Sequence, residues 1–476
     1  MHVLWILIVN LVVGGLGLDL VVNTGSDALP SGVDSSSNCL SGTGICNFRG
    51  AIAAANANAG VPTRILFDGV STVTMDPDQT DTPESLVIAD GVDLTIVGGE
   101  DGGVGITNNA SPPLNLLQHR LFGCGGGNIR FTLEDINFYE WHSTHYPMRD
   151  SNKGTLIYCE KPWTMQLKRV RFDRCTTWRG VIYLTACQDC LVENCTFTDM
   201  HAPGAYSWGG AMVLNSGRSY DEETGRAPID NFRFVNSHFF NVTSSDLGGA
   251  LYIYGTTRLL LDSVSFHSTR SNHGGAIYLR NPPEDENCAE CDGSCSPWYS
   301  GNIVLRDVNF TDSMVYIFNS GDGGALRLEG IENIDLTRIS FTNCRSGKGG
   351  GGLYVKYVQK LVIEDSLFQN CTANSKGGAI QFFNWNREVS IKNSIFRGNL
   401  GRGNGGAISW WERNYQTNIS DTIFEESSTL MNGGALHLDN FNYDKGPQDN
   451  AGIDFNGVVF RRNSATINGG AIVAGT

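Results

Sequence analysis

The chain has 476 residues, a formal net charge of −15 and a pI near 5.0. Its hydrophobic content of 41% is enough for a sizeable core and excludes a wholly disordered chain. The acidic balance excludes a general nucleic-acid binder, which needs a basic face to neutralise phosphates. Glycine is abundant at 58 residues, about 12% against a usual ~7%, whereas proline is scarce at 14. Many glycines with few prolines predict short strands joined by tight turns.

The N-terminus predicts export. Val3 to Val13 form an apolar run that only Asn10 interrupts, and small residues including Gly17 follow it. The run is too short to span a bilayer and is typical of a secretory signal. We therefore expect residues 1–17 to be a signal peptide, with a buried first strand as the alternative, and the mature chain to be secreted or displayed at the cell surface. No later segment is apolar for long enough to predict an integral membrane span.

A repeated motif determines the predicted architecture. Gly-Gly-Ala-Ile/Leu recurs about every 27 residues, and a phenylalanine precedes most copies by about nine residues. The intact copies begin at Gly248, Gly274, Gly323, Gly377, Gly405, Gly433 and Gly469. Apolar residues between the copies alternate with period two, and no helical stripe runs through the unit. Three short strands in about 27 residues fit one turn of a parallel β-helix, in which equivalent residues of successive coils stack about 4.8 Å apart.

The repeat resembles that of the chlamydial polymorphic outer membrane proteins. Besides Gly-Gly-Ala-Ile, it carries Phe-x-x-Asn, which is intact at Phe396/Asn399 and Phe460/Asn463. Cysteine replaces the asparagine at Cys175, Cys344 and Cys371. The resemblance covers roughly residues 130–476 and implies a surface-displayed, right-handed parallel β-helix. We expect an all-β, single-stranded right-handed parallel β-helix of about 11–12 coils over residues 63–476. Loop insertions are expected near 216–228, 282–300 and 441–451.

A second resemblance concerns the N-terminal end, where Cys46-Asn-Phe-Arg-Gly-Ala-Ile52 is similar to the Cys-Ser/Thr-Leu-Arg-Glu-Ala-Ile segment of many secreted β-helix proteins. In those proteins the segment forms a short helix that caps the open coil. Residues 48–58 are the Ala-rich helical stretch of this chain, and an open end needs a cap. We expect an N-terminal strand and capping helix within residues 18–62, and we expect Cys39 and Cys46 to close the preceding loop.

A further disulfide is predicted from the stacking of coils. Cys344 and Cys371 each lie three residues after the phenylalanine of consecutive coils. Stacking places their Cα atoms about 4.8 Å apart, within the ~4.4–6.8 Å that a disulfide accepts. The alternative is a pair of buried free thiols.

Sequence motifs give no catalytic residue. Signatures of polygalacturonases, alginate epimerases, zinc proteases, serine hydrolases and phosphate-binding loops are absent from the sequence. Asp262, Asp307, Asp365 and Asp421 precede the repeat phenylalanines and are expected to cap turns, with a Ca²⁺ site as the alternative. We therefore predict no metal and no cofactor. Asn-x-Ser/Thr sequons, which permit glycosylation in a secreted protein, occur at Asn109, Asn194, Asn241, Asn309, Asn370 and Asn418.

The solvent side of the strand after each Gly pair carries the candidate binding residues. Period two directs the fourth and sixth residues after the first glycine outward. These residues, called the strip below, are Tyr252/Tyr254, Tyr278/Arg280, Arg327/Glu329, Tyr354/Lys356, Gln381/Phe383, Ser409/Trp411 and His437/Asp439. We expect an exposed strip of aromatic and charged side chains whose rings stack on sugars, unless loops cover it. A catalytic group made of Glu329, Lys356 and His437 is the less favoured interpretation.

Three functions remain open. The favoured one is a non-catalytic secreted or cell-surface protein that is adhesive and binds an extracellular glycan or a surface protein through the strip. The second is a carbohydrate-active enzyme, a polysaccharide lyase or glycoside hydrolase of the pectate-lyase-like class. The third is a structural spacer.

Overall fold

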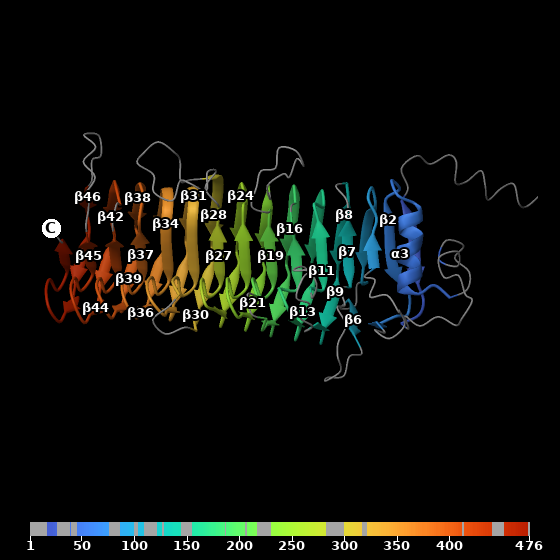
Figure 1. Cartoon of the computed structure of the whole chain (residues 1–476), viewed down its shortest axis with the longest axis horizontal. Helices are drawn as coiled ribbons and strands as arrows, with labels where there is room; N and C mark the ends of the chain where they lie inside the picture. Colours follow the sequence, from blue (N-terminus) through green and yellow to red (C-terminus); the bar gives the residue numbers. More distant parts are fainter. Residues whose placement is uncertain are drawn as a thin grey trace, which may run out of the picture.

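The computed structural model describes residues 17–25, 39, 45–75, 86–99, 103–108, 121–125, 128–143, 155–185, 187–204, 207–216, 230–281, 299–316, 321–411, 414–439 and 452–474. Nearly all of the predicted signal peptide and of the three predicted insertions lies outside these residues. The described chain is a right-handed parallel β-helix, as the sequence predicted, and it forms one long rod (Figure 1). Its strands form a 25-stranded, a 13-stranded and an 11-stranded sheet, all parallel.

The 25-stranded sheet contains two rows of strands. The first row, whose strands from β19 on follow the Gly pairs, consists of β4 (Leu86–Ile88), β7 (Phe122–Gly125), β11 (Ile157–Glu160), β15 (Ile182–Leu184), β19 (Met212–Asn215), β23 (Leu251–Tyr254), β27 (Ile277–Arg280), β31 (Leu326–Thr337), β34 (Leu353–Glu364), β37 (Ile380–Phe383), β41 (Ile408–Trp411), β45 (Leu436–Asp439) and β49 (Ile472–Ala474). The second row consists of β1 (Leu18–Val22), β2 (Thr63–Phe67), β5 (Asp93–Val97), β8 (Arg130–Glu134), β12 (Thr164–Lys168), β16 (Asp189–Glu193), β20 (Phe232–Val235), β24 (Arg258–Asp262), β28 (Tyr299–Arg306), β38 (Glu388–Lys392), β42 (Thr417–Ser420) and β46 (Ile453–Asn456). The long strands β31 and β34 run through both rows and join them.

The other two sheets complete each coil. The 13-stranded sheet, here the phenylalanine sheet, consists of β3 (Thr72–Met75), β6 (Val104–Asn108), β9 (Ile136–Tyr139), β13 (Arg171–Asp173), β17 (Thr196–Thr198), β21 (His238–Phe240), β25 (Ser265–His267), β29 (Asn309–Thr311), β32 (Ser340–Thr342), β35 (Leu367–Gln369), β39 (Ile395–Arg397), β43 (Ile423–Glu425) and β47 (Val459–Arg461). The 11-stranded sheet consists of β10 (His142–Ser143), β14 (Thr176–Thr177), β18 (His201–Ala202), β22 (Thr243–Ser244), β26 (Arg270–Ser271), β30 (Met314–Val315), β33 (Arg345–Ser346), β36 (Thr372–Ala373), β40 (Leu400–Gly401), β44 (Ser428–Thr429) and β48 (Ser464–Ala465). A coil therefore has a fourth short strand that the sequence did not predict, in the loop before the Gly pair.

The repeat phenylalanines form a continuous stack inside the rod. Successive ring centroids are 4.6–5.2 Å apart and the ring planes differ by 3–14°. The members are Phe138, Phe172, Phe197, Phe239, Phe266, Phe310, Phe341, Phe368, Phe396, Phe424 and Phe460. The phenylalanine sheet has 13 strands, one per coil, against the 11–12 coils expected. The difference arises because β3 and β6 contain no phenylalanine, so the repeat motif did not predict their coils.

The Gly pair forms a corner that excludes side chains. Gly377 has φ +65°, and a Cβ there would lie 2.0 Å from the carbonyl oxygen of Ile380. A Cβ on Gly378 would lie 2.2 Å from the carbonyl oxygen of Gly406 in the next coil. Positive φ and close backbone approach are the two conditions that only glycine meets, so the pair is structural.

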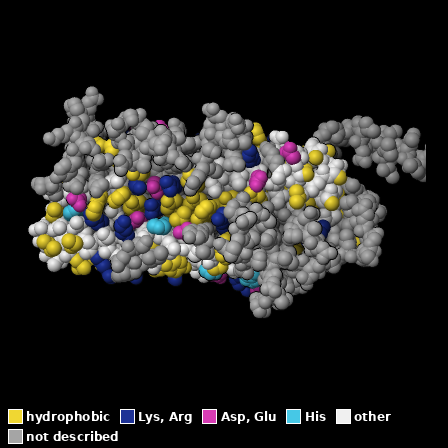
Figure 2. All heavy atoms as spheres, in the orientation of Figure 1, with side chains coloured by type: hydrophobic (Ala, Val, Ile, Leu, Met, Phe, Trp, Pro, Cys, Tyr) yellow, Lys and Arg dark blue, Asp and Glu magenta, His cyan; other side chains and the backbone are white. Residues whose placement is uncertain are grey.

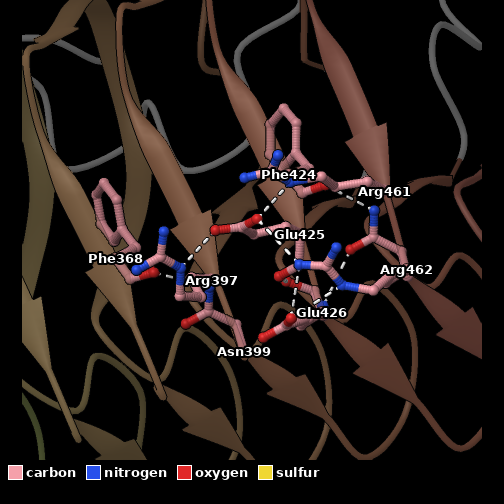
Figure 3. A network of polar contacts seen from close by, with 10 residues as sticks. Phe368, Arg397, Asn399, Phe424, Glu425, Glu426, Arg461 and Arg462 are labelled. Atoms are coloured by element: carbon pink, nitrogen blue, oxygen red, sulfur yellow. Dashed lines mark hydrogen bonds and ion pairs between the residues drawn. The ribbon is translucent and has the colours of Figure 1, made fainter.

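At several coils the residue three places after the phenylalanine binds the preceding coil. Asn399 Nδ2 donates to the carbonyl oxygen of Phe368 at 3.0 Å (Figure 3). The thiols of Cys344 and Cys371 make the equivalent contacts at 3.6 and 3.5 Å, to the carbonyls of Phe310 and Phe341. The structure therefore differs from the expected Cys344–Cys371 disulfide, since both are buried free thiols whose sulfur atoms already face a main-chain acceptor.

An outward carboxylate is buried in the same region. Glu425 lies between Arg397 and Arg461, its register partners in the coils before and after, and both guanidinium groups donate to it (Figure 3). Its side chain is 2% exposed. The hydrogen bonds from Arg461 and Arg397 lower the pKa of Glu425 below its usual value.

The helix α3 (Phe48–Ala57) lies at the N-terminal end of the rod and contacts β1, β2 and β4 (Figure 1). Asn47 caps it, because its side chain accepts a hydrogen bond from the backbone N–H of Gly50 at 2.8 Å. A disulfide joins Cys39 and Cys46 immediately before the helix. Two further disulfides join Cys124 to Cys159, which the sequence reasoning missed, and Cys187 to Cys190, a Cys-x-x-Cys pair whose spacing in an exported chain favours a disulfide over a zinc site.

Candidate functional site

The strip lies on the outer face of the first row, where it forms two adjacent ladders. The fourth-place ladder is Tyr252, Tyr278, Arg327, Tyr354, Gln381, Ser409 and His437, each in register with the next. The sixth-place ladder is Tyr254, Arg280, Glu329, Lys356, Phe383, Trp411 and Asp439. The repeat thus brings residues up to 187 positions apart in the sequence onto one face, since the two ladders of the strip together run from Tyr252 to Asp439.

The fourth-place ladder is buried, contrary to the exposed strip that we expected. Tyr252, Tyr278 and Tyr354 are only 7, 5 and 4% exposed. Neighbouring rings cover each other, and the Tyr252 and Tyr278 rings are stacked at 5.7 Å with an interplanar angle of 14°. Because the ring faces are occupied along the ladder, these three tyrosines cannot stack on sugar rings as expected. The sixth-place side chains are half-buried, except for Glu329, which is buried.

Arg327 is the centre of a charged cluster. Its guanidinium lies between the rings of Tyr278 and Tyr354, 5.1 and 5.0 Å from their centroids, in a double cation–π contact. Its Nη1 donates to His273 Nδ1 at 2.9 Å and lies 3.5 Å from Asp322. Its Nη2 donates to Glu329 Oε2 at 3.3 Å.

Glu329 also contacts Tyr278 and Lys356. The Tyr278 hydroxyl donates to Oε2 at 3.2 Å, and Lys356 Nζ lies 3.5 Å from Oε1. Burial by itself raises the pKa of Glu329, but the charges of Arg327, Lys356 and Arg280 outweigh it and hold the pKa below its usual value. Glu329 is therefore ionised at neutral pH.

His273 and Tyr278 are the neutral titratable groups of the cluster. Burial, reinforced by the charge of Arg327, lowers the pKa of His273 to about 4. Burial raises the pKa of Tyr278 to about 12. A neutral imidazole and a neutral phenol beside a carboxylate are groups that can donate and accept protons.

Several buried polar atoms of the strip lack a hydrogen-bond partner within the described residues. They are Arg280 Nε, Arg327 Nε, Gln381 Oε1, Ser409 Oγ and His437 Nδ1. Buried polar atoms are normally paired, and four of these five unpaired atoms belong to the fourth-place ladder, with Arg280 Nε on the sixth-place ladder. Figure 2 shows this face, with basic and acidic side chains gathered over β27, β31 and β34 and hydrophobic side chains on both sides.

The structure does not bring the predicted catalytic group together. Glu329 and Lys356 form an ion pair, but His437 lies on β45, three coils beyond the β34 coil of Lys356. Burial lowers the pKa of His437 below its usual value. On the neighbouring sixth-place ladder, the ring of Trp411 makes a cation–π contact with the ammonium group of Lys376.

Sequence reasoning missed the residues that directly precede the Gly pairs. His273 and Asp322 contact Arg327 from this position, and Trp208 stacks on Tyr252 at 5.0 Å. Their place immediately before the first glycine of each copy is the signal that could have found them. The fourth-place ladder also continues towards the N-terminus through Val213 to Tyr183 and Tyr158.

The fold and this face define a parallel β-helix repeat protein. No protein-family model matches the chain, and no curated protein matches it, so the chlamydial-type repeat and the secreted-type cap remain predictions. Within the described residues no helix is long and apolar enough to cross a bilayer, and no group of three or more His, Cys, Asp or Glu could hold a metal ion.

Among solved structures, the chain is similar to tailspike protein 3 of bacteriophage CBA120, with 12% identity and a TM-score of 0.47. That comparison covers 94% of this chain, which spans only 58% of the tailspike. The chain is also similar to the A-module of the mannuronan C-5 epimerase AlgE4 of Azotobacter vinelandii, with 10% identity, a TM-score of 0.42, and 90% and 94% of the two chains covered. The chain is similar as well to the periplasmic alginate epimerase AlgG, with 7% identity and a TM-score of 0.32. That comparison covers 87% of this chain and 78% of AlgG. At these scores the similarity carries no information about function.

Proposed function

We propose that the protein is a secreted β-helix protein whose strip binds an extended glycan. The observation that carries this proposal is the series of unpartnered polar atoms from Arg280 to His437, which follows one face over successive coils. A linear saccharide offers hydroxyl groups at regular intervals, and regular spacing is what stacked coils provide.

A glycan suits the strip better than a protein surface does. The buried core of a protein interface is apolar and is supplied by large aromatic side chains. Here the tyrosine rings are already packed against each other and against Arg327, which leaves polar and charged groups for a ligand.

Secretion is supported by the chemistry of the cysteines. Three disulfides, including Cys39–Cys46 and Cys124–Cys159, fit an oxidising compartment. The sequon asparagines that the structure describes are all exposed, as glycosylation requires. They are Asn194, Asn241, Asn309, Asn370 and Asn418.

A glycan array tests the proposal with a matched pair of double variants. Gln381→Met with Ser409→Ala removes unpartnered strip atoms, so folding should be unaffected. Gln416→Met with Ser390→Ala makes the same chemical changes at the second row, since Ser390 lies in β38 and Gln416 directly precedes β42. We expect the strip variant to lose about tenfold or more in affinity and the second-row variant to keep wild-type binding. Equal binding by both variants would refute the strip as the binding face.

A carbohydrate-active enzyme is the second candidate, because Glu329, Tyr278 and neutral His273 form a group capable of acid–base chemistry. Incubation with polysaccharides, followed by assays for new reducing ends and unsaturated products, tests it. Turnover that Glu329→Gln abolishes would establish catalysis. If the protein neither binds nor converts any glycan, the structural spacer is the one function of the three that remains.

A further inference from the structure

The sixth-place ladder has an unusual charge order at the centre of the strip. Arg280, Glu329 and Lys356 occupy equivalent places on β27, β31 and β34 and are in register. Lys356 pairs with Glu329, and Glu329 also pairs with Arg327. Arg280 makes no ion pair with a described residue, and its buried Nε has no hydrogen-bond partner there. One carboxylate therefore faces three cations.

The whole cluster carries more positive than negative charge. Four cations act on it, namely Arg280, Arg327, Lys348 and Lys356, against the carboxylates of Asp322 and Glu329. His273 adds no charge at neutral pH. Counted over the described residues, the cluster thus has two surplus positive charges, although the chain as a whole has a net charge of −15.

A purely structural role would favour a balanced cluster. Partly buried charges are normally paired, because an unpaired charge away from water is costly. The surplus is placed where the strip meets solvent, since the side chain of Lys356 is 21% exposed, against 13% for Arg327. An anionic group of a ligand would complete the alternation of charges along the ladder.

We infer that the glycan site selects acidic saccharides, whose carboxylate groups lie against Arg280 and Lys356. The inference rests on the proposed glycan-binding function and names the class of ligand. Guanidinium and ammonium groups bind carboxylates through charge-assisted hydrogen bonds, and the planar fork of an arginine can bind one bidentately. Glu329 and Arg327 then act as positioning residues that fix the two cations and the tyrosine edges around the bound group.

The experiment compares two ligands that differ only in charge. An oligogalacturonate of fixed length and its fully methyl-esterified form share a backbone, and the ester lacks the carboxylates. Affinities are measured by calorimetry for the wild type, Lys356→Gln and Lys360→Gln. Lys360 is the control, because it is an exposed lysine on the same strand, β34, and lies in the second row outside the strip.

We expect the wild type and Lys360→Gln to bind the acid about tenfold more tightly than the ester. Lys356→Gln should lose most of that preference while its affinity for the ester stays the same. Its fold is safeguarded because Glu329 keeps Arg327 as a partner.

Three results would overturn the inference, and they are distinguishable. If the acid and the ester bind equally well, the charge selection is refuted and the glycan-binding proposal stands. If neither binds and the glycan array is also negative, both fail together. An equal loss of preference in Lys356→Gln and Lys360→Gln would show that only the overall charge matters, and this would also refute the site.

Discussion

The phenylalanine stack predicts that two adjacent residues respond in opposite ways to the same substitution. Phe239 and Phe240 are neighbours on β21 and point to opposite sides of the sheet. Phe239 is 1% exposed and stacks between Phe197 and Phe266, at 4.6 and 4.7 Å. Phe240 is 48% exposed, and its ring stacks on that of His267 with the ring centroids 5.0 Å apart.

The expected magnitudes follow from burial. Replacing a buried phenylalanine by alanine costs about 3–5 kcal/mol in the free energy of unfolding, since transfer energy is lost and a cavity is left. Loss of the two stacked pairs, each worth about 0.5–1.5 kcal/mol, places Phe239→Ala at the upper end of this range. Phe240→Ala loses one exposed cross-strand pair and should cost less than about 1 kcal/mol.

Urea unfolding followed by circular dichroism measures both variants against the wild type. Because a solenoid can unfold in segments, native-state hydrogen exchange of the coils around β21 should accompany the midpoints. Similar costs for the two variants, or a larger cost for Phe240→Ala, would refute the account of the stack.

Three further predictions concern the corner, the buried carboxylate and the free thiols. Gly377→Ala should destabilise the protein more than Gly91→Ala in the same urea assay, because both glycines have positive φ but only the former would place a Cβ against backbone; equal costs would show that the close approach is unimportant. The lowered pKa of Glu425 contributes stability that is present above its unfolded value of 4.5 and lost as the pH falls through the folded value. The difference in melting temperature between wild type and Glu425→Gln should therefore shrink from pH 7 to pH 3, and a constant difference would contradict this. Burial raises the pKa of the Cys344 thiol, so Cys344 and Cys371 should resist alkylation until the protein unfolds; a disulfide-linked peptide in non-reducing mapping would refute the free thiols.

The sequence predicted the ladders because the repeat has a nearly constant period. Each strand that follows a Gly pair begins at the same offset, so the sequence alone places Tyr278, Arg327 and Tyr354 side by side, as the structure has them. Where the motif is degenerate, as around Cys124 and Cys159, the register was not predictable and their disulfide was missed.

The burial of the strip was not predictable from the same pattern. Period two gives the direction of a side chain but not what covers it. The rings of Tyr252 and Tyr278 cover each other, and Arg327 covers both Tyr278 and Tyr354. The contact between His273 and Arg327 was not predictable either. His273 lies in the irregular loop before the Gly pair, where the residue type changes from coil to coil.

Hydrogen–deuterium exchange with and without bound glycan tests the central claim most directly. The ligand is the saccharide with the strongest array signal, added at a concentration that saturates the protein. We predict slower exchange in first-row strands from β27 to β45 and in the residues directly before their Gly pairs, with the phenylalanine sheet unchanged. Protection that is confined to the phenylalanine sheet or to the second row, with β31 and β34 unaffected in their first-row halves, would contradict the account.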